Sequence, residues 1–123
     1  MKLLIVDDNP KIRFLLRNLC EHLFEDIYEC EDGDEAIKFC RSEKPEWVLM
    51  DIKMKRVDGF IATREIKKSA PDTRIIMISQ YKDHNFIEEA YRSGAVNFIN
   101  KENLVNIESI ISEQSNLRNS PYK

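Results

Sequence analysis

The chain has 123 residues, of which 42% are hydrophobic and 33% are charged, with only three glycines and four prolines. A chain of this length buries one real core and is too short for two ordinary domains, and its composition excludes a disordered or fibrous protein. Nineteen basic and 22 acidic residues give a net charge of -3. This balance argues against a one-sided positive field, and therefore against nucleic acid as a direct partner.

Short hydrophobic runs alternate along the chain with stretches that have helical spacing, which indicates βα units wound into a parallel sheet. The first, third and fourth runs are almost continuously apolar, as expected of interior strands with helices on both faces. The second run alternates apolar and polar residues, which is typical of an edge strand. The predicted strands are Lys2–Val6, Asp26–Glu31, Trp47–Met50, Arg74–Ile78 and Asn97–Asn100.

The helices between these strands carry recognisable start signals. Asn9 before Pro10 predicts one cap, and Asp34, Asp58 and Asp83 predict three more. Apolar residues at helical spacing are expected to face the sheet. They are Ile12, Leu15, Leu16, Leu19 and Leu23 in the first helix, Ala36, Ile37 and Cys40 in the second, Phe60, Ile61 and Ile66 in the third, Phe86, Ile87 and Ala90 in the fourth, and Leu104, Ile107, Ile110 and Ile111 in the fifth.

The two ends of the chain and its cysteines point to an ordinary intracellular domain. The apolar run Leu3 to Val6 is too short for a signal peptide or a membrane span, so we expect a cytoplasmic protein without membrane contact. Residues 116–123 are polar and are interpreted as a tail or linker stub after a domain of residues 1–115. The three cysteines form no Cys-x-x-Cys pair and are interpreted as reduced thiols.

Polar side chains follow four of the predicted strands directly. Asp7 and Asp8 follow the first, Asp51 the third, Ser79 the fourth and Lys101 the fifth. Because sites in open parallel sheets form outside the carboxyl ends of the strands, we expect these residues to converge at one rim. Each of them alone would be an ordinary strand end or helix cap. Their joint placement predicts a functional site.

This set of side chains suits phosphoryl transfer. Three clustered carboxylates repel one another, so a hard divalent cation such as Mg2+ is expected among them. A carboxylate can accept a phosphoryl group where cations surround the equatorial oxygens. Lys101 and the Ser79 hydroxyl are suitable donors to those oxygens.

Five short stretches, taken in order and with their intervals, resemble the response-regulator receiver family of two-component systems. They are Leu4 to Asn9, Val48 to Met54, Val57 to Gly59, Ile76 to Ser79 and Phe98 to Lys101. The resemblance covers roughly residues 2–112. It implies an α/β, flavodoxin-like (βα)5 fold with three layers and strand order 2-1-3-4-5.

The resemblance also implies a role for each site residue. Asp51 would be phosphorylated, with self-catalysis but without a classical enzyme activity. The other implied roles are Mg2+ binding by Asp7, Asp8, Asp51 and the backbone carbonyl of Lys53, a switch hydroxyl on Ser79, a switch aromatic ring at Phe98, and phosphoryl binding by Lys101.

The partners implied by the resemblance are a sensor histidine kinase or phosphotransfer protein and a downstream protein or output domain. The downstream contact would use the helix through Phe86 and Ala90, the strand Asn97–Asn100 and the helix through Ile107 and Ile111. The domain would be a monomer or a phosphorylation-promoted dimer. The chain could be a stand-alone regulator or part of a longer one.

Several residues depart from the family pattern. Lys55 and Arg56 stand where a proline usually follows the methionine, which predicts a more basic and less rigid loop. Gln80 replaces a small residue, and Glu102 replaces a proline and its cis peptide. Tyr81 is expected at the mouth of the site, where it either modulates phosphoryl lifetime or simply covers the loop.

Two alternative functions can be compared with the same residues. A pseudo-receiver that binds proteins without taking phosphate stays open because of the altered loop after Met54. A small aspartyl-phosphate phosphatase or mutase would need an Asp-x-Asp pattern after the first strand and a substrate cap, which Asp7 to Asn9 lacks. His22 and His84 lie too far apart in sequence, and without a suitable Ser or Cys, to indicate a hydrolase.

Overall fold

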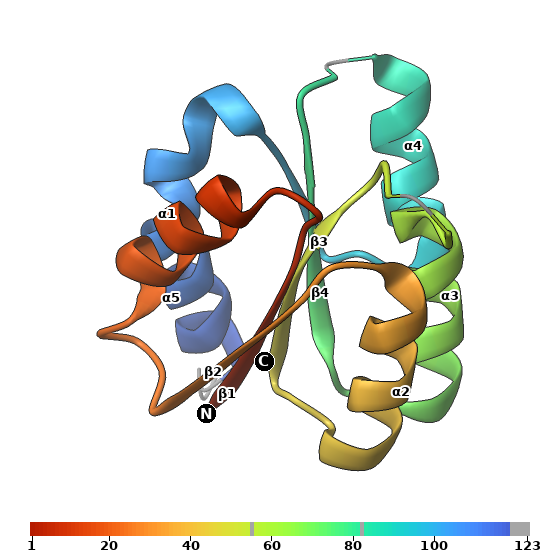
Figure 1. Cartoon of the computed structure of the whole chain (residues 1–123). Helices are drawn as coiled ribbons and strands as arrows, with labels where there is room; N and C mark the ends of the chain where they lie inside the picture. The colour runs from red at the N-terminus through yellow and green to blue at the C-terminus, as the bar shows by residue number, and fades with distance from the viewer. Residues whose placement is uncertain (55, 82, 119–123) are drawn as a thin grey trace.

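The structure is a computed structural model that describes residues 1–54, 56–81 and 83–118. In this part of the chain, strands and helices alternate from end to end (Figure 1). The strands are β1 (Lys2–Val6), β2 (Asp26–Cys30), β3 (Trp47–Asp51), β4 (Arg74–Ser79) and β5 (Asn97–Asn100). The helices are α1 (Pro10–Cys20), α2 (Gly33–Glu43), α3 (Gly59–Ser69), α4 (His84–Ser93), the 3-10 helix η1 (Lys101–Asn106) and α5 (Ile107–Arg118).

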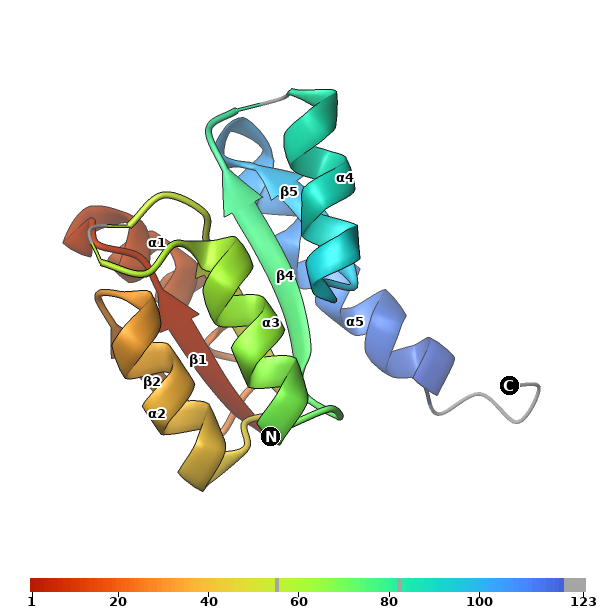
Figure 2. The ribbon, with the colours of Figure 1, turned by 90° about the vertical axis from the view of Figure 1, so that its right-hand side faces the viewer.

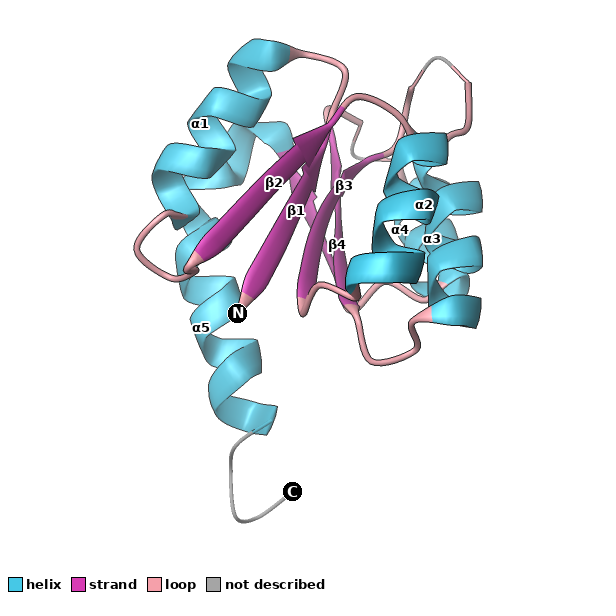
Figure 3. Ribbon diagram, turned by 60° about the horizontal axis from the view of Figure 1, so that its bottom comes forward, coloured by secondary structure: helices cyan, strands magenta, loops and turns pink. Residues whose placement is uncertain are grey.

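The strands form one parallel sheet in the order β2-β1-β3-β4-β5, which confirms the predicted topology. The register places Val6 opposite Met50, and Met50 opposite Met77, so the carboxyl ends of the central strands are level. Figure 2 shows the arrowheads of β1 and β4 at the same end of the sheet. Helices α2, α3 and α4 cover one face, and α1 and α5 cover the other (Figure 3). The predicted three-layer α/β/α fold is therefore confirmed.

Alternation along the strands sends buried side chains into two cores, one on each face of the sheet. In β1, Leu4 and Val6 belong to the core beneath α2, α3 and α4, whereas Leu3 and Ile5 belong to the core beneath α1 and α5. The apolar residues of β1, β3 and β4 are buried throughout, as predicted for interior strands. Trp47, the first residue of β3, is buried in the second core.

Two helix side chains that were predicted to be buried are exposed. Leu15 is 42% exposed and Ile61 is 46% exposed. The reason is that each helix faces the sheet along a narrow stripe, which passes through Leu16 in α1 and Ala62 in α3. The residues next to these stripes turn toward solvent.

The predicted caps of α1, α3 and α4 are confirmed, but that of α2 is wrong. The N-cap of α2 is Asp32, whose side chain accepts a hydrogen bond from the backbone N–H of Glu35, and Asp34 lies in the first turn. Strands β3 and β4 each extend one residue further than predicted, so Asp51 and Ser79 are the last residues of their strands. Leu104, expected in the last α-helix, is buried in η1 instead.

The remaining expectations from the sequence concern the cysteines, membrane-spanning segments and the C-terminal tail. All three cysteines are free and buried, and burial raises the pKa of each thiol to about 12, as expected of inert reduced thiols. No described helix is both long enough and apolar enough to cross a membrane. Lys55 and residues 119–123 of the predicted tail lie outside the described residues.

Candidate functional site

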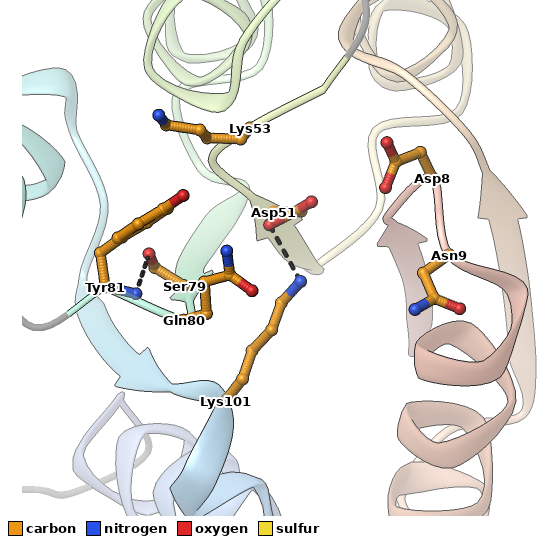
Figure 4. Close-up of a pocket in the computed structure, with 8 residues that line it drawn as sticks. All are labelled: Asp8, Asn9, Asp51, Lys53, Ser79, Gln80, Tyr81 and Lys101. Carbon is orange, nitrogen blue, oxygen red and sulfur yellow. Dashed lines mark hydrogen bonds and ion pairs between the residues drawn. The ribbon is translucent and has the colours of Figure 1, made fainter.

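An open pocket of about 220 Å³ lies at the carboxyl edge of the sheet (Figure 4). Its walls come from four loops that are distant in sequence, as the strand ends predicted. The lining residues are Asp8, Asn9, Asp51, Lys53, Ser79, Gln80, Tyr81 and Lys101. Asp7 directly follows β1, is buried and contacts Lys101, one of the lining residues.

The three predicted carboxylates come together at this edge. Asp7, Asp8 and Asp51 each place one carboxylate oxygen so that the three atoms lie within 4.8 Å of one another. Asp7 and Asp51 are buried, whereas Asp8 is exposed to the pocket. The backbone N–H of Asn9 donates to Oδ1 of Asp7 at 2.9 Å. This bond fixes the Asp7 side chain where the chain turns from β1 into α1.

Lys101 forms ion pairs with two acids of this cluster. Its Nζ lies 3.3 Å from Oδ2 of Asp7 and 3.4 Å from Oδ1 of Asp51. Lys101 is held there because it directly follows β5, where the Asn100 side chain accepts a hydrogen bond from the backbone N–H of Glu102 and starts η1. The structure thus places the predicted lysine against two of the predicted acids.

The electrostatics show a cluster with too little positive charge. Burial, together with the neighbouring charge of Asp7, raises the pKa of Asp51 to about 6, although Lys101 acts in the opposite direction. Burial likewise raises the pKa of Asp7. For Lys101, burial lowers the pKa, but the charges of Asp51 and Asp7 outweigh it and leave the pKa raised. The carboxyl groups of Asp7 and Asp51 therefore hold their protons more tightly than free carboxyl groups do.

The residues of the cluster fit a hard divalent cation. Oδ2 of Asp7 is buried, and within the described residues it accepts no hydrogen bond. The Lys101 ammonium lies 3.3 Å from this oxygen as an ion-pair partner. Three carboxylates that crowd together, one of them with a buried oxygen that accepts no hydrogen bond, match the oxygen ligands that Mg2+ prefers. Among the described residues, this trio is the one group of three or more His, Cys, Asp or Glu side chains close enough to share an ion.

Ser79 is buried beside the pocket, at the end of β4. Its Oγ accepts a hydrogen bond from the backbone N–H of Tyr81 at 2.9 Å. Tyr81 lies at the pocket mouth, as predicted, and its ring stacks on Phe86 with centroids 5.5 Å apart. The Lys53 ammonium lies 4.9 Å from the centre of the Tyr81 ring. This contact joins the loop after β3 to the loop after β4. It could not be predicted from the sequence, because no local pattern links Lys53 to Tyr81.

Phe98 and the histidines lie outside the pocket. Phe98 is partly buried and packs against the core beneath α4. His22 pairs with Glu108, and His84 with Glu88, in exposed contacts, so neither histidine belongs to the site. The described residues contain no cis peptide bond, in agreement with the replacement of proline by Glu102.

Comparison with known proteins places this site in a family. The response regulator receiver domain family matches residues 3–112. The chemotaxis protein CheY of Bacillus subtilis (strain 168) is 36% identical over 101 residues, which are 81% of this chain and 84% of that protein. The transcriptional regulatory protein DegU of Brevibacillus brevis is 29% identical over 104 residues, 83% of this chain but only 44% of DegU. The chain therefore spans less than half the length of that regulator.

Solved structures similar to this chain are also receiver domains of response regulators. The response regulator domain of Thermotoga maritima CheB has a TM-score of 0.78 at 30% identity, covering 93% of this chain and 92% of that one. The receiver domain of NtrX from Brucella abortus has a TM-score of 0.81 at 29% identity, covering 91% of this chain and 95% of that one. The proteins of this family are signalling domains rather than classical enzymes. The chain belongs to the response regulator receiver domain family of two-component systems.

Proposed function

We propose that Asp51 accepts a phosphoryl group from the phosphohistidine of a sensor histidine kinase or phosphotransfer protein. The observation that carries this proposal is the position of the Asp51 carboxylate. It lies on an open pocket, within 4.8 Å of two other carboxylates and 3.4 Å from the Lys101 ammonium. In the transfer, an Asp51 oxygen forms a bond to phosphorus, the phosphorus–nitrogen bond breaks, and its electron pair returns to the imidazole.

Asp7, Asp8 and Asp51, with the backbone carbonyl of Lys53, would hold Mg2+. When bound, the ion supplies positive charge next to the carboxylates and the phosphoryl oxygens. The residues of the chain do the rest. Lys101 binds one phosphoryl oxygen through its ammonium, and the Ser79 hydroxyl donates a hydrogen bond to another.

The direct test is labelling with acetyl phosphate and Mg2+, followed by intact-mass measurement. We expect one added phosphoryl group in the wild type and none in Asp51→Asn, because the amide oxygen of asparagine is too weak a nucleophile. Asp26→Asn, an exposed acid at the start of β2, is the matched control and should label normally. Absence of labelling in the wild type would favour a pseudo-receiver, and persistent labelling of Asp51→Asn would place the acceptor elsewhere.

The signal would leave the pocket through Ser79. Its hydroxyl now accepts a hydrogen bond from the Tyr81 N–H. Donation to a phosphoryl oxygen would draw the side chain and the following loop inward, which makes room for Phe98 to turn. The affected face would be α4, β5 and α5, where Tyr91 is exposed. This face would contact a downstream protein or output domain, in the cytoplasm, with the domain as a monomer or a phosphorylation-promoted dimer.

Ser79→Ala is expected to separate phosphorylation from this response. The variant keeps Asp51 and should still take phosphate, but it lacks the hydroxyl that links the phosphoryl group to the loop. Backbone amide NMR with and without beryllofluoride, an aspartyl-phosphate mimic, measures the response. Shifts at Tyr91 and Phe98 should fall to a small fraction of the wild-type shifts. Equal shifts in both proteins would show that Ser79 is not the link.

A further inference from the structure

The loop between β3 and α3 is tied to the start of α2 by Arg56. The guanidinium donates through Nε at 3.2 Å and through Nη2 at 2.5 Å to Oδ2 of Asp32. The two partners differ in exposure, because the Asp32 side chain is 8% exposed and that of Arg56 is 66% exposed. An exposed guanidinium is thus paired with a buried carboxylate. We call this contact the Arg56–Asp32 latch.

Asp32 is fixed because its other oxygen caps α2. Oδ1 accepts a hydrogen bond from the backbone N–H of Glu35 at 3.1 Å. One carboxylate oxygen therefore caps the helix while the other binds Arg56. The Glu35 N–H and Arg56 together lower the pKa of Asp32, and the carboxylate stays charged. The backbones also touch here, since a Cβ at Gly33 would lie 2.6 Å from the carbonyl oxygen of Val57. The loop rests directly on the start of α2.

The far end of the loop, at Gly59, packs against the residues that end β3 and begin the loop. The backbone N–H of Gly59 donates to the carbonyl oxygen of Ile52 at 2.7 Å, and a Cβ at Gly59 would collide with the carbonyl oxygen of Asp51. Lys53 lies between these anchors and lines the pocket. Arg56 lines a second hollow of about 240 Å³ together with Asp8, so the latch borders the acid cluster.

We propose that the latch is a positioning device for Mg2+ binding, with Arg56 holding the loop so that the Lys53 carbonyl faces the acid cluster. The inference rests on the proposed function. Arg56 is a positioning residue rather than a ligand. It takes over a task that a proline after Met54 would otherwise perform by stiffening the chain. An Arg with two donors on one carboxylate is suited to this because its planar fork loses little freedom on binding.

The direction in which the Mg2+ affinity changes when Arg56 is replaced distinguishes a positioning role from a simple effect of charge. Arg56→Gln removes a positive charge beside an acidic site, so electrostatics alone would make Mg2+ bind more tightly. Loss of loop positioning would make it bind more weakly. Loss of an outer contact to a metal site typically costs about 10- to 100-fold in metal affinity, and we expect a loss of about tenfold here.

The experiment is a Mg2+ titration followed by the backbone amide NMR signals of Asp7, Asp51 and Lys53. Arg56→Gln should raise the Kd about tenfold. Asp32→Asn should raise it similarly, since asparagine still caps a helix but cannot hold the guanidinium by charge. The double variant should be no weaker than the weaker single one. Arg64→Gln breaks a comparable Arg–carboxylate contact, the 2.7 Å pair with Glu89, and is the control expected to leave the Kd unchanged.

The outcomes separate two failures. If the wild type binds Mg2+ and Arg56→Gln has an equal or lower Kd, the latch has no positioning role and only this inference is overturned. If the wild type shows no Mg2+-dependent shifts, the proposed function itself is overturned. Arg56→Lys keeps the charge but not the planar fork, and a Kd between those of the wild type and Arg56→Gln would support positioning by that fork.

Discussion

Asp51→Asn is expected to stabilise the metal-free domain by about 3 kcal/mol at pH 7, although it abolishes phosphorylation. The pKa of Asp51 is raised from 3.8 to about 6, and each pKa unit corresponds to about 1.36 kcal/mol between the two protonation states. At pH 7 the folded wild type must keep a charge that burial and the Asp7 carboxylate both oppose. Asparagine fills the same space without that charge.

The pH dependence has a defined sign. Because the folded pKa of Asp51 lies above its unfolded value, the folded state holds this proton more tightly. The resulting stability is fully present below pH 3.8, the unfolded value, and is lost as the pH rises through about 6. The advantage of Asp51→Asn over the wild type should therefore grow between these pH values and then level off.

Urea unfolding from pH 4 to pH 8 in the presence of a chelator measures this difference. The exposed-acid variant Asp26→Asn should follow the wild-type curve. Mg2+ at a hundredfold excess over its Kd should add about 2.7 kcal/mol to the wild type, because only the native state has the site. If Asp51→Asn is less stable than the wild type at pH 7 without metal, the carboxylate is not strained by its neighbours.

The sheet could be predicted from the sequence because its signals are local. Continuous apolar runs identified the interior strands, and a parallel sheet necessarily brings the carboxyl ends of its strands to one edge. This is why Asp7, Asp51 and Lys101 were expected together. The distances that join them confirm the convergence. The chemical role of each residue stays a prediction.

Features that depend on contacts between residues far apart in the sequence could not be predicted from local patterns. Asp32 and Asp34 are both acids near the start of α2, and local pattern does not choose between them. The contact of Gly33 with Val57 and the hydrogen bonds from Arg56 set Asp32 as the cap. The sequence predicted Arg56 to make its loop more basic and less rigid, but the structure ties this side chain to another loop.

Lys101→Met is expected to destabilise the metal-free domain by about 3 kcal/mol at pH 7, the lower end of the cost of leaving a buried charge without its partner. The lower end applies because Lys101 is still 21% exposed. The ammonium is within 3.4 Å of Asp7 and Asp51 oxygens, and both side chains are almost fully buried. Without it, the two carboxylates face each other with no neutralising charge.

Protonation and metal offer two independent checks on this loss. Removing the lysine should raise the pKa of Asp51 further, so the cost should shrink as the pH falls and the carboxylates take up protons. In Lys101→Met/Asp51→Asn the cost should also shrink, since one of the repelling charges is gone. Mg2+ should restore part of the stability by supplying the missing positive charge.

Urea unfolding at pH 4.5 and pH 7, with and without Mg2+, tests all three. A loss that is equal at both pH values, and equal with and without Asp51, would mean that Lys101 stabilises the domain through the contacts of its aliphatic stem and not through its charge.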